Sequence, residues 1–222
     1  MELKFGNHYA FNMHHSTLIQ IFRLVFIFIS VAAATSNMAE TRLVRDEEGI
    51  SVSELVDQSR TLPVLIATTL IHATPNQVAE WIGAVHTYTR WQYNCVEAYT
   101  IPQPDKSLRI YNRVASPWPV ADRDVVLQSN VTMHPDDSIT IEFFNVDDAT
   151  VKLSAGVVRM PYLAGKYELS PTSGNTHVVY TIDSDPGGKL PAWLVRRASK
   201  ELPYFTLKKL RDLVESGPPP EK

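Results

Sequence analysis

Cysteine is nearly absent from this sequence, with Cys95 alone among 222 residues. An intramolecular disulfide is therefore impossible, and a structural zinc site built from several thiolates is excluded. An excess of positive charge is also missing, since 21 Lys and Arg stand against 24 Asp and Glu and the formal net charge is −3 at pH 7. A nucleic-acid binder needs a basic face to neutralise phosphates, so we expect no nucleic-acid partner. Zinc-protease, serine-hydrolase and phosphate-loop motifs are missing too, and we predict no metal and no cofactor.

Long hydrophobic runs are rare, and the clearest one lies near the N-terminus. Residues 24–34, "LVFIFISVAAA", are uninterrupted by charge, and Arg23 comes immediately before them. Ala32 and Ala34 have the spacing of a signal-peptidase site. We interpret residues 1–34 as a signal peptide, which predicts an exported protein, periplasmic or secreted. An uncleaved membrane anchor and a buried helix of the fold are the alternatives.

The rest of the chain has the composition of one soluble domain. Over the whole sequence 44% of residues are hydrophobic and 20% are charged, which is typical of globular proteins. We place the domain at residues 41–216 and expect it to be a monomer. Residues 217–222, "GPPPEK", are expected to form a disordered tail.

Apolar and polar residues alternate over much of this domain, which is typical of strands. Helical spacing appears twice: in residues 74–85, with Thr74 as N-cap and Pro75 at the first position, and in residues 190–215. Pro203 should kink the second helix. The pattern predicts an α+β fold with an antiparallel sheet that has one covered face. Strands are expected at residues 49–55, 63–71, 107–114, 124–133, 138–144 and 176–183.

A strongly bent sheet and one long helix leave volume that neither can fill, so we predict an internal hydrophobic cavity. An imperfectly packed core is the alternative. Asn112 and Ser129 fall among the inward positions of two strands and could orient a polar head group. The apolar residues expected on the wall are Ile110, Val125, Leu127, Val131, Ile141, Phe143 and Tyr180 from strands, and Leu194, Ala198 and Phe205 from the final helix.

A stiff loop precedes one of these strands. Pro117 and Pro119 fix the backbone on either side of Trp118 and remove two donors, so the loop cannot join the sheet ladder. Arg123 and Asp124 follow at the start of the strand. An arginine there can hold a carboxylate or loop carbonyls through two hydrogen bonds. We interpret Trp118, Arg123 and Asp124 as a structural clamp and not as ligand contacts.

The same stretch, "PWPVADRDVV" at 117–126, resembles the signature of the START (steroidogenic acute regulatory protein-related lipid transfer) family. The early "EEGISV" strand, Trp91 after the first helix, and "YELSPTSGNTHVVYTIDSDPGGKLPAWL" before the last helix stand in family order. The resemblance covers about residues 43–215. It implies a helix-grip fold, in which a curved antiparallel sheet wraps around the C-terminal helix. It also implies that the chain, as a bacterial-type single-domain member, binds lipid for transfer or sensing.

One departure concerns the kind of ligand. Sterol-binding members of the family carry a buried pair of an acid and an arginine inside the tunnel. In this sequence Ser129 stands at the arginine position, and the preceding strand offers Asn112 in place of an acid. We therefore expect fatty acyl chains, phospholipids or other hydrophobic small molecules at least as readily as a sterol.

Two other functions stay open. A cavity enzyme of the polyketide cyclase or hydratase type would need an acid or base in the apolar lining. The strand pattern places His177 outward and His134 in a turn, while Cys95 is expected to be a small buried hydrophobe. Asp147 and Asp148 are expected to form a solvated pair. A plain interaction module is the third possibility.

The final helix carries many positive charges, which either form a solvated face or allow transient docking on an anionic bilayer. In the second case the helix, or the loop that follows residue 150, would move as a lid. The charges in question are Arg196, Arg197, Lys200, Lys208, Lys209 and Arg211.

Overall fold

The computed structural model describes residues 40–57 and 62–221. The segment interpreted as a signal peptide or anchor lies outside these residues. Within the described part of the chain, no helix combines the length and the apolar character needed to cross a bilayer.

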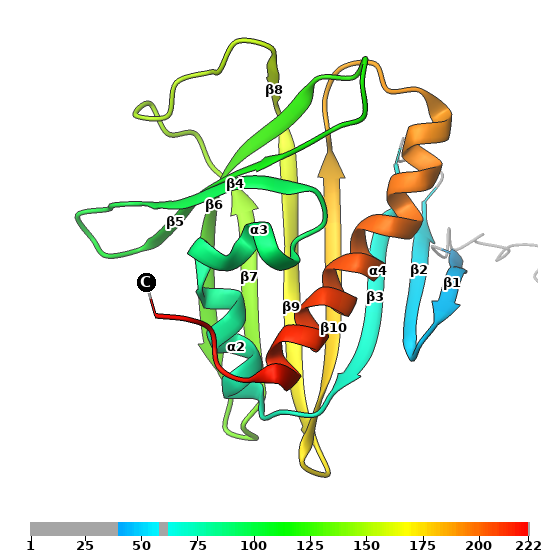
Figure 1. Cartoon of the computed structure of the whole chain (residues 1–222), viewed down its shortest axis with the longest axis vertical. Helices are drawn as coiled ribbons and strands as arrows, with labels where there is room; N and C mark the ends of the chain where they lie inside the picture. The colour runs from blue at the N-terminus through cyan, green and yellow to red at the C-terminus, as the bar shows by residue number, and fades with distance from the viewer. Residues whose placement is uncertain (1–39, 58–61, 222) are drawn as a thin grey trace, which may run out of the picture. The chain divides into compact units, whose positions relative to one another are not determined.

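One antiparallel sheet forms most of the domain (Figure 1). Its strands are β1 (Glu40–Glu47), β2 (Ile50–Val56), β3 (Val64–Ile71), β4 (Cys95–Ile101), β5 (Leu108–Val114), β6 (Asp122–Met133), β7 (Ile139–Asn145), β8 (Val157–Arg159), β9 (Tyr162–Thr172) and β10 (Asn175–Asp185). The helices are α2 (Pro75–Gly83), the one-turn elements η1 (Val85–Thr87) and α3 (Tyr88–Trp91), and α4 (Ala192–Ser216).

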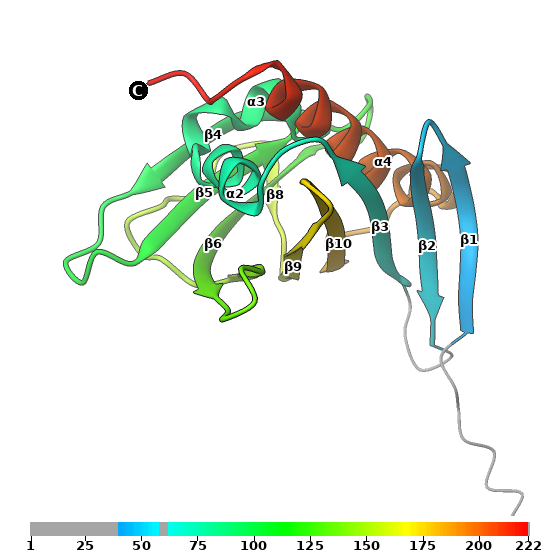
Figure 2. The same cartoon turned by 90° about the horizontal axis from the view of Figure 1, so that it is seen from below.

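The order of strands across the sheet is β1-β2-β3-β10-β9-β7-β6-β5-β4. Neighbours in this order are antiparallel, and the short β8 pairs in parallel with the start of β6. At the centre, β3 pairs with β10, which comes more than a hundred residues later in the chain. The sheet is strongly curved, and the helices lie in its hollow (Figure 2).

The early helix begins as its sequence predicts. The Thr74 hydroxyl accepts a hydrogen bond from the Gln77 backbone N–H, and the Gln77 side chain accepts one from the Thr74 N–H. This capping box, with Pro75 at the first helical position, satisfies donors that the first turn otherwise leaves unpaired. The helix then buries Trp81 and Ile82 against the inner face of the sheet.

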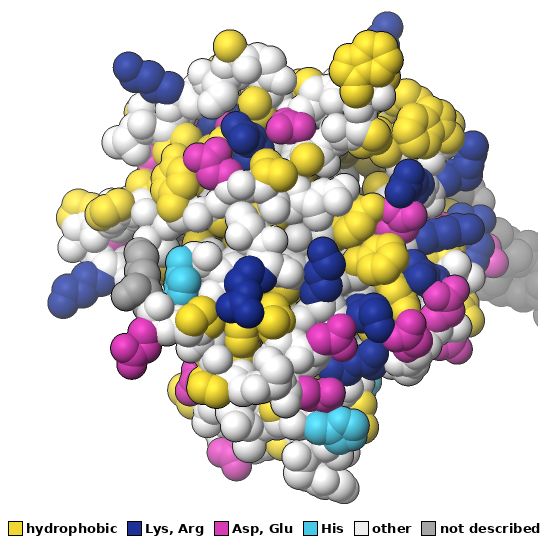
Figure 3. All heavy atoms as spheres, in the orientation of Figure 1, with side chains coloured by type: hydrophobic (Ala, Val, Ile, Leu, Met, Phe, Trp, Pro, Cys, Tyr) yellow, Lys and Arg dark blue, Asp and Glu magenta, His cyan; other side chains and the backbone are white. Residues whose placement is uncertain are grey.

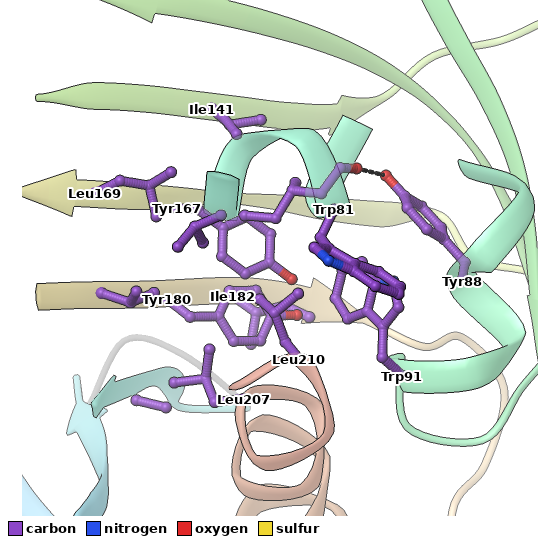
Figure 4. Close-up of a cluster of buried hydrophobic side chains, with 14 of the residues drawn as sticks. Trp81, Tyr88, Trp91, Ile141, Tyr167, Leu169, Tyr180, Ile182, Leu207 and Leu210 are labelled. Atoms are coloured by element: carbon purple, nitrogen blue, oxygen red, sulfur yellow. Dashed lines mark hydrogen bonds between the residues drawn. The ribbon is translucent and has the colours of Figure 1, made fainter. Parts of the chain in front are cut away.

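The final helix crosses the sheet with Pro203 in its middle. Its axis changes direction along its length (Figures 1 and 2), as expected where a proline removes a backbone donor. Beyond the proline, Tyr204, Leu207 and Leu210 are fully buried and belong to the core. Figure 4 shows Leu207 and Leu210 pointing into it. They anchor the second half of α4 to the sheet.

The predicted helix-grip fold is confirmed: the sheet is curved and antiparallel, is not closed, and holds the C-terminal helix. Four strands went unpredicted, namely β1, β4, β8 and β9. β1 and β4 are the edges of the sheet and are largely exposed, so their hydrophobic alternation is weak.

Candidate functional site: an internal cavity

A cavity of about 540 Å³ lies between the inner face of the sheet and α4. Strands β5, β6, β7, β9 and β10 form most of its wall, and the first half of α4 closes it. One end is formed by two loops, through Pro117 on one side and Pro186 and Leu190 on the other. A volume of this size suits a small-molecule ligand, since such sites measure about 300–1,000 Å³.

Ten of the twelve residues predicted for the wall do lie on it. From the strands these are Ile110, Asn112, Val125, Leu127, Ser129, Ile141, Phe143 and Tyr180, and from α4 they are Leu194 and Ala198. Strand alternation located the first eight, because residues two apart face the same side of a sheet.

Val131 is a correction. Alternation along β6 predicted the correct face of the sheet for this residue, since Val131 is paired with Ile141, which lines the cavity. Val131 is nevertheless 59% exposed. The reason is that β5 begins at Leu108, opposite Ser129, so beyond Ser129 strand β6 has a neighbour on one side only.

Phe205 is a second correction. Its ring stacks on Tyr93, with centroids 5.7 Å apart, and packs edge-on against Tyr204. The cavity side of α4 instead includes Leu202 and Thr206, which lie four residues apart and therefore on one face of the helix.

The aromatic part of the wall was only partly predicted. The rings of Tyr167 and Tyr180 stack with centroids 4.4 Å apart, and both side chains are buried (Figure 4). Burial raises the pKa of each phenol above its usual value. A phenol is protonated at neutral pH even at its usual pKa, so both hydroxyls can act as hydrogen-bond donors.

Gly165 on β9 allows two neighbouring strands to pack closely beside the cavity. A Cβ at this position would lie 2.3 Å from the Thr181 carbonyl oxygen and 2.5 Å from Phe143 Cζ. Glycine thus allows the Phe143 ring to lie against the backbone of β9, with the ring on the cavity wall.

Two uncharged polar side chains face the cavity from β5 and β6. The Asn112 amide donates to Gln92 Oε1, while its own Oδ1 is buried and meets no donor within the described chain. The Ser129 hydroxyl donates to the Glu142 carbonyl oxygen at 3.2 Å. A ligand that carries a hydrogen-bond donor could therefore satisfy Asn112.

The predicted clamp holds only in part. Arg123 donates to the carbonyl oxygens of Pro186, Gly187 and Ala121, so it ties the loop before α4 to the start of β6. Trp118 is 92% exposed and holds nothing against the domain, so its assignment to the clamp is wrong.

Asp124 points to the opposite face of the sheet from Arg123. Its two carboxylate oxygens accept hydrogen bonds from Arg159 at 2.8 and 3.0 Å, and Tyr111 donates to one of them at 3.2 Å. Asp124 therefore holds β5, β6 and β8 together on the outer face of the sheet.

The candidate acid and base groups lie away from the wall. His134 and His177 are exposed, and no Asp, Glu or His belongs to the described residues that line the cavity. Asp148 was expected to be solvated like Asp147, but it accepts a hydrogen bond from Arg109 at 3.0 Å. Hydrogen bonds from Thr150 and Arg109 lower the pKa of Asp148 to about 2.

Cys95 is buried, and burial raises the pKa of its thiol to about 11. Such a thiol is a poor nucleophile at neutral pH. Among the described residues, no group of three or more His, Cys, Asp or Glu side chains could hold a metal ion.

A family model described as START domain matches residues 31–217. The chain belongs to the START family. A STAR-related lipid transfer protein from Xanthomonas axonopodis superimposes on this START protein with a TM-score of 0.71 and 27% identity, over 78% of this chain and 98% of that one. Human StAR-related lipid transfer protein 5 also gives a TM-score of 0.71, at 17% identity over 91% of this chain and 99% of its own.

An uncharacterised protein of Pseudomonas aeruginosa is 28% identical to this START protein over 198 residues, which is 88% of this chain and 98% of that protein. The fold of the START family is known for binding lipids or other hydrophobic ligands.

Proposed function

We propose that this protein binds one lipid-like molecule in its cavity and carries it between membranes or senses it. The observation that carries the proposal is the cavity itself, about 540 Å³ with a mainly apolar wall between the sheet and α4. Burying apolar ligand surface there would stabilise a complex by about 25 cal/mol per Å². The volume suits one acyl chain or one compact ring system and not two long acyl chains.

Native mass spectrometry of the purified domain tests this proposal. We expect a bound species with the mass of a lipid, which organic extraction removes and lipid vesicles restore. A protein that emerges without ligand and takes none up from vesicles would contradict the proposal. The cyclase or hydratase alternative predicts that an offered ligand is recovered with changed mass or structure, whereas a carrier returns it unchanged.

We further propose that the cavity end formed by the two loops is where the protein meets a bilayer. Trp118 projects from one loop and is 92% exposed, and Trp193 at the start of α4 is 48% exposed. Lys189, Arg196 and Lys200 are also exposed around the start of α4. Figure 3 shows hydrophobic side chains gathered at the upper right, over the start of this helix. Exposed tryptophans beside basic residues favour an anionic lipid surface.

Three of the six basic residues predicted to give α4 its positive charge, Arg197, Lys208 and Arg211, have partners within the protein. Lys208 pairs with Glu48, Arg211 donates to the Glu48 carbonyl oxygen at 2.9 Å, and Arg197 pairs with Glu201 at 2.8 Å. These contacts tie α4 to the β1–β2 turn or lie within the helix. The proposed docking therefore depends on the first turns of α4 and on the loop that carries Trp118.

The docking proposal predicts the behaviour of a double variant, Trp118→Ser with Trp193→Ser. We expect its binding to vesicles that contain anionic phospholipid to fall at least fivefold, because two interfacial anchors are lost. Vesicle co-sedimentation measures this directly. The matched control is Met133→Ser, which removes an exposed hydrophobic residue at the far end of β6. Equal loss in both proteins would contradict the proposed surface.

A further inference from the structure

Arg123 is a buried cation on the cavity wall. It is the second residue of β6, and strand alternation turns its side chain inward while Asp122 and Asp124 on either side turn outward. The residue is only 5% exposed. It lines the cavity near the end formed by Pro117 and Leu190.

The guanidinium meets carbonyl oxygens and no carboxylate within the described part of the chain. Nε donates to the Pro186 oxygen at 3.4 Å, Nη2 to the Gly187 oxygen at 3.3 Å, and Nη1 to the Ala121 oxygen. A guanidinium has five N–H groups. Three are used, so each terminal nitrogen retains one.

The nearby acids are committed elsewhere. Asp122 accepts from the Ser116 N–H at 3.1 Å and lies 3.8 Å from Arg113 on the outer face. Asp124 holds Arg159 through both of its oxygens.

A buried charge with no carboxylate in contact is costly, and burial lowers the pKa of the Arg123 guanidinium more than the nearby charge of Asp122 raises it. An anion placed in the cavity against this side chain would offset part of that cost. One N–H group remains on each terminal nitrogen, which is the number of donors that a bidentate carboxylate needs, and bidentate pairs of this kind are strong. A phosphate would present three oxygens to the same two donors.

We propose that Arg123 binds the carboxylate of a single-chain amphiphile, such as a long-chain fatty acid. The acyl chain then lies along the apolar wall formed by Val125 and Leu127 on β6, the strand that carries Arg123, and by Ile141 on the neighbouring strand β7. This inference rests on the proposed function and specifies the class of ligand.

A matched pair of ligands tests the inference on the delipidated wild-type domain. Hexadecanoic acid and methyl hexadecanoate share one chain and differ in charge, and each is titrated at pH 8 against a bound fluorescent apolar probe. Hydrogen bonds to charged groups contribute about 1.5–3 kcal/mol, so we expect the acid to bind at least tenfold more tightly than the ester.

Two variants locate the effect. Arg123→Gln should abolish the preference for the acid. Its affinity for the ester, which does not use the positive charge, reports separately whether loss of the contacts to Pro186 and Gly187 has altered the cavity. Arg113→Gln removes a positive charge from the next strand on the outer face, and it should retain the preference.

The outcomes separate the inference from the function beneath it. Wild-type protein that binds the ester as tightly as the acid overturns the assignment of Arg123, even if Arg123→Gln fails to fold. Loss of the preference in Arg113→Gln as well would also overturn it, because the overall positive charge of this region, and not contact with Arg123, would then explain the selectivity. Wild-type protein that binds neither ligand refutes the binding function itself.

Discussion

Two of the polar side chains on the cavity wall, Asn112 and Arg123, lie on neighbouring strands and face inward. In the β5–β6 ladder Asn112 lies opposite Val125 and Val114 lies opposite Arg123, so the two polar residues are diagonal neighbours on one face. Diagonal neighbours are about 7–8 Å apart, which long side chains can bridge. A charge introduced at Asn112 should therefore act on any anion bound by Arg123.

Asn112→Asp is the variant that tests this relation. The new carboxylate would either take the open N–H groups of Arg123 or repel the carboxylate of the ligand. We expect hexadecanoic acid to bind about tenfold more weakly, with methyl hexadecanoate little changed, in the same displacement titration. Asn112→Leu is the control, since it changes the side chain without adding charge. Unchanged acid affinity in the aspartate variant would show that the two positions do not share a ligand.

Residues also show what the sequence could and could not reveal about the site. Alternation located eight of the wall residues on the strands, because the face of the sheet to which a side chain points follows from its position along the strand. Trp118 was misassigned for the opposite reason. A tryptophan between two prolines suggests packing, and only the three-dimensional course of the loop shows that the ring has nothing to pack on.

At the scale of elements, β9 shows how far a packing requirement can distort a sequence pattern. Gly165 interrupts its alternation, and a Cβ there would overlap both the Thr181 carbonyl and the Phe143 ring. Glycine inside a strand weakens the local signal, which is one reason why β9 was not predicted. The need for glycine comes from the Phe143 ring on the neighbouring strand β7, so the sequence of β9 alone could not predict it.

Gly165→Ala should accordingly destabilise the domain by about 1–3 kcal/mol, because the methyl group forces the Phe143 ring or the backbone to move. Urea unfolding measures the difference. Gly83→Ala is the matched control, since a Cβ at that helical position has nothing within 4 Å. It should be neutral or stabilising by up to about 1 kcal/mol. Equal stability of the Gly165 variant and wild type would mean that the contact at β9 relaxes freely.

The final helix was predicted in extent but not fully in orientation. Its apolar residues allow more than one face, and Pro203 changes the direction of the axis between them. A step of three residues from Leu202 leads to Phe205, and a step of four leads to Thr206. Only packing against Tyr93 settles which of these two side chains leaves the cavity.

At the scale of the whole molecule, the buried thiol and the buried phenols make the domain less stable at alkaline pH. Burial raises the pKa of Cys95 from its usual 9.0 to about 11 and that of Tyr111 from 10.0 to about 12. Tyr88, Tyr167 and Tyr180 are shifted upward as well. The unfolded chain releases these protons at a lower pH than the folded domain does, so unfolding becomes easier as pH rises.

We expect the free energy of unfolding to be steady up to about pH 8 and to fall by about 1–2 kcal/mol by about pH 9.5, with Cys95 as the largest single contributor because its unfolded pKa is the lowest of these groups. Urea unfolding at the two pH values gives the comparison. In Cys95→Ala the decrease should be smaller, because the first group to titrate is gone. A wild-type domain that is equally stable at both pH values would contradict the assigned burial of the thiol.

The pairing of β3 with β10 has a consequence for how the chain reaches its native state. The first three strands form a meander, and one edge of β3 has no partner until β10, residues 175–185, has been made and pairs with it. Contacts between such distant segments slow folding, because a long loop must close before they form. During synthesis, the chain therefore exposes an unpaired edge of β3 until β10 has been made. A truncation before β10 leaves that edge free to pair with other chains.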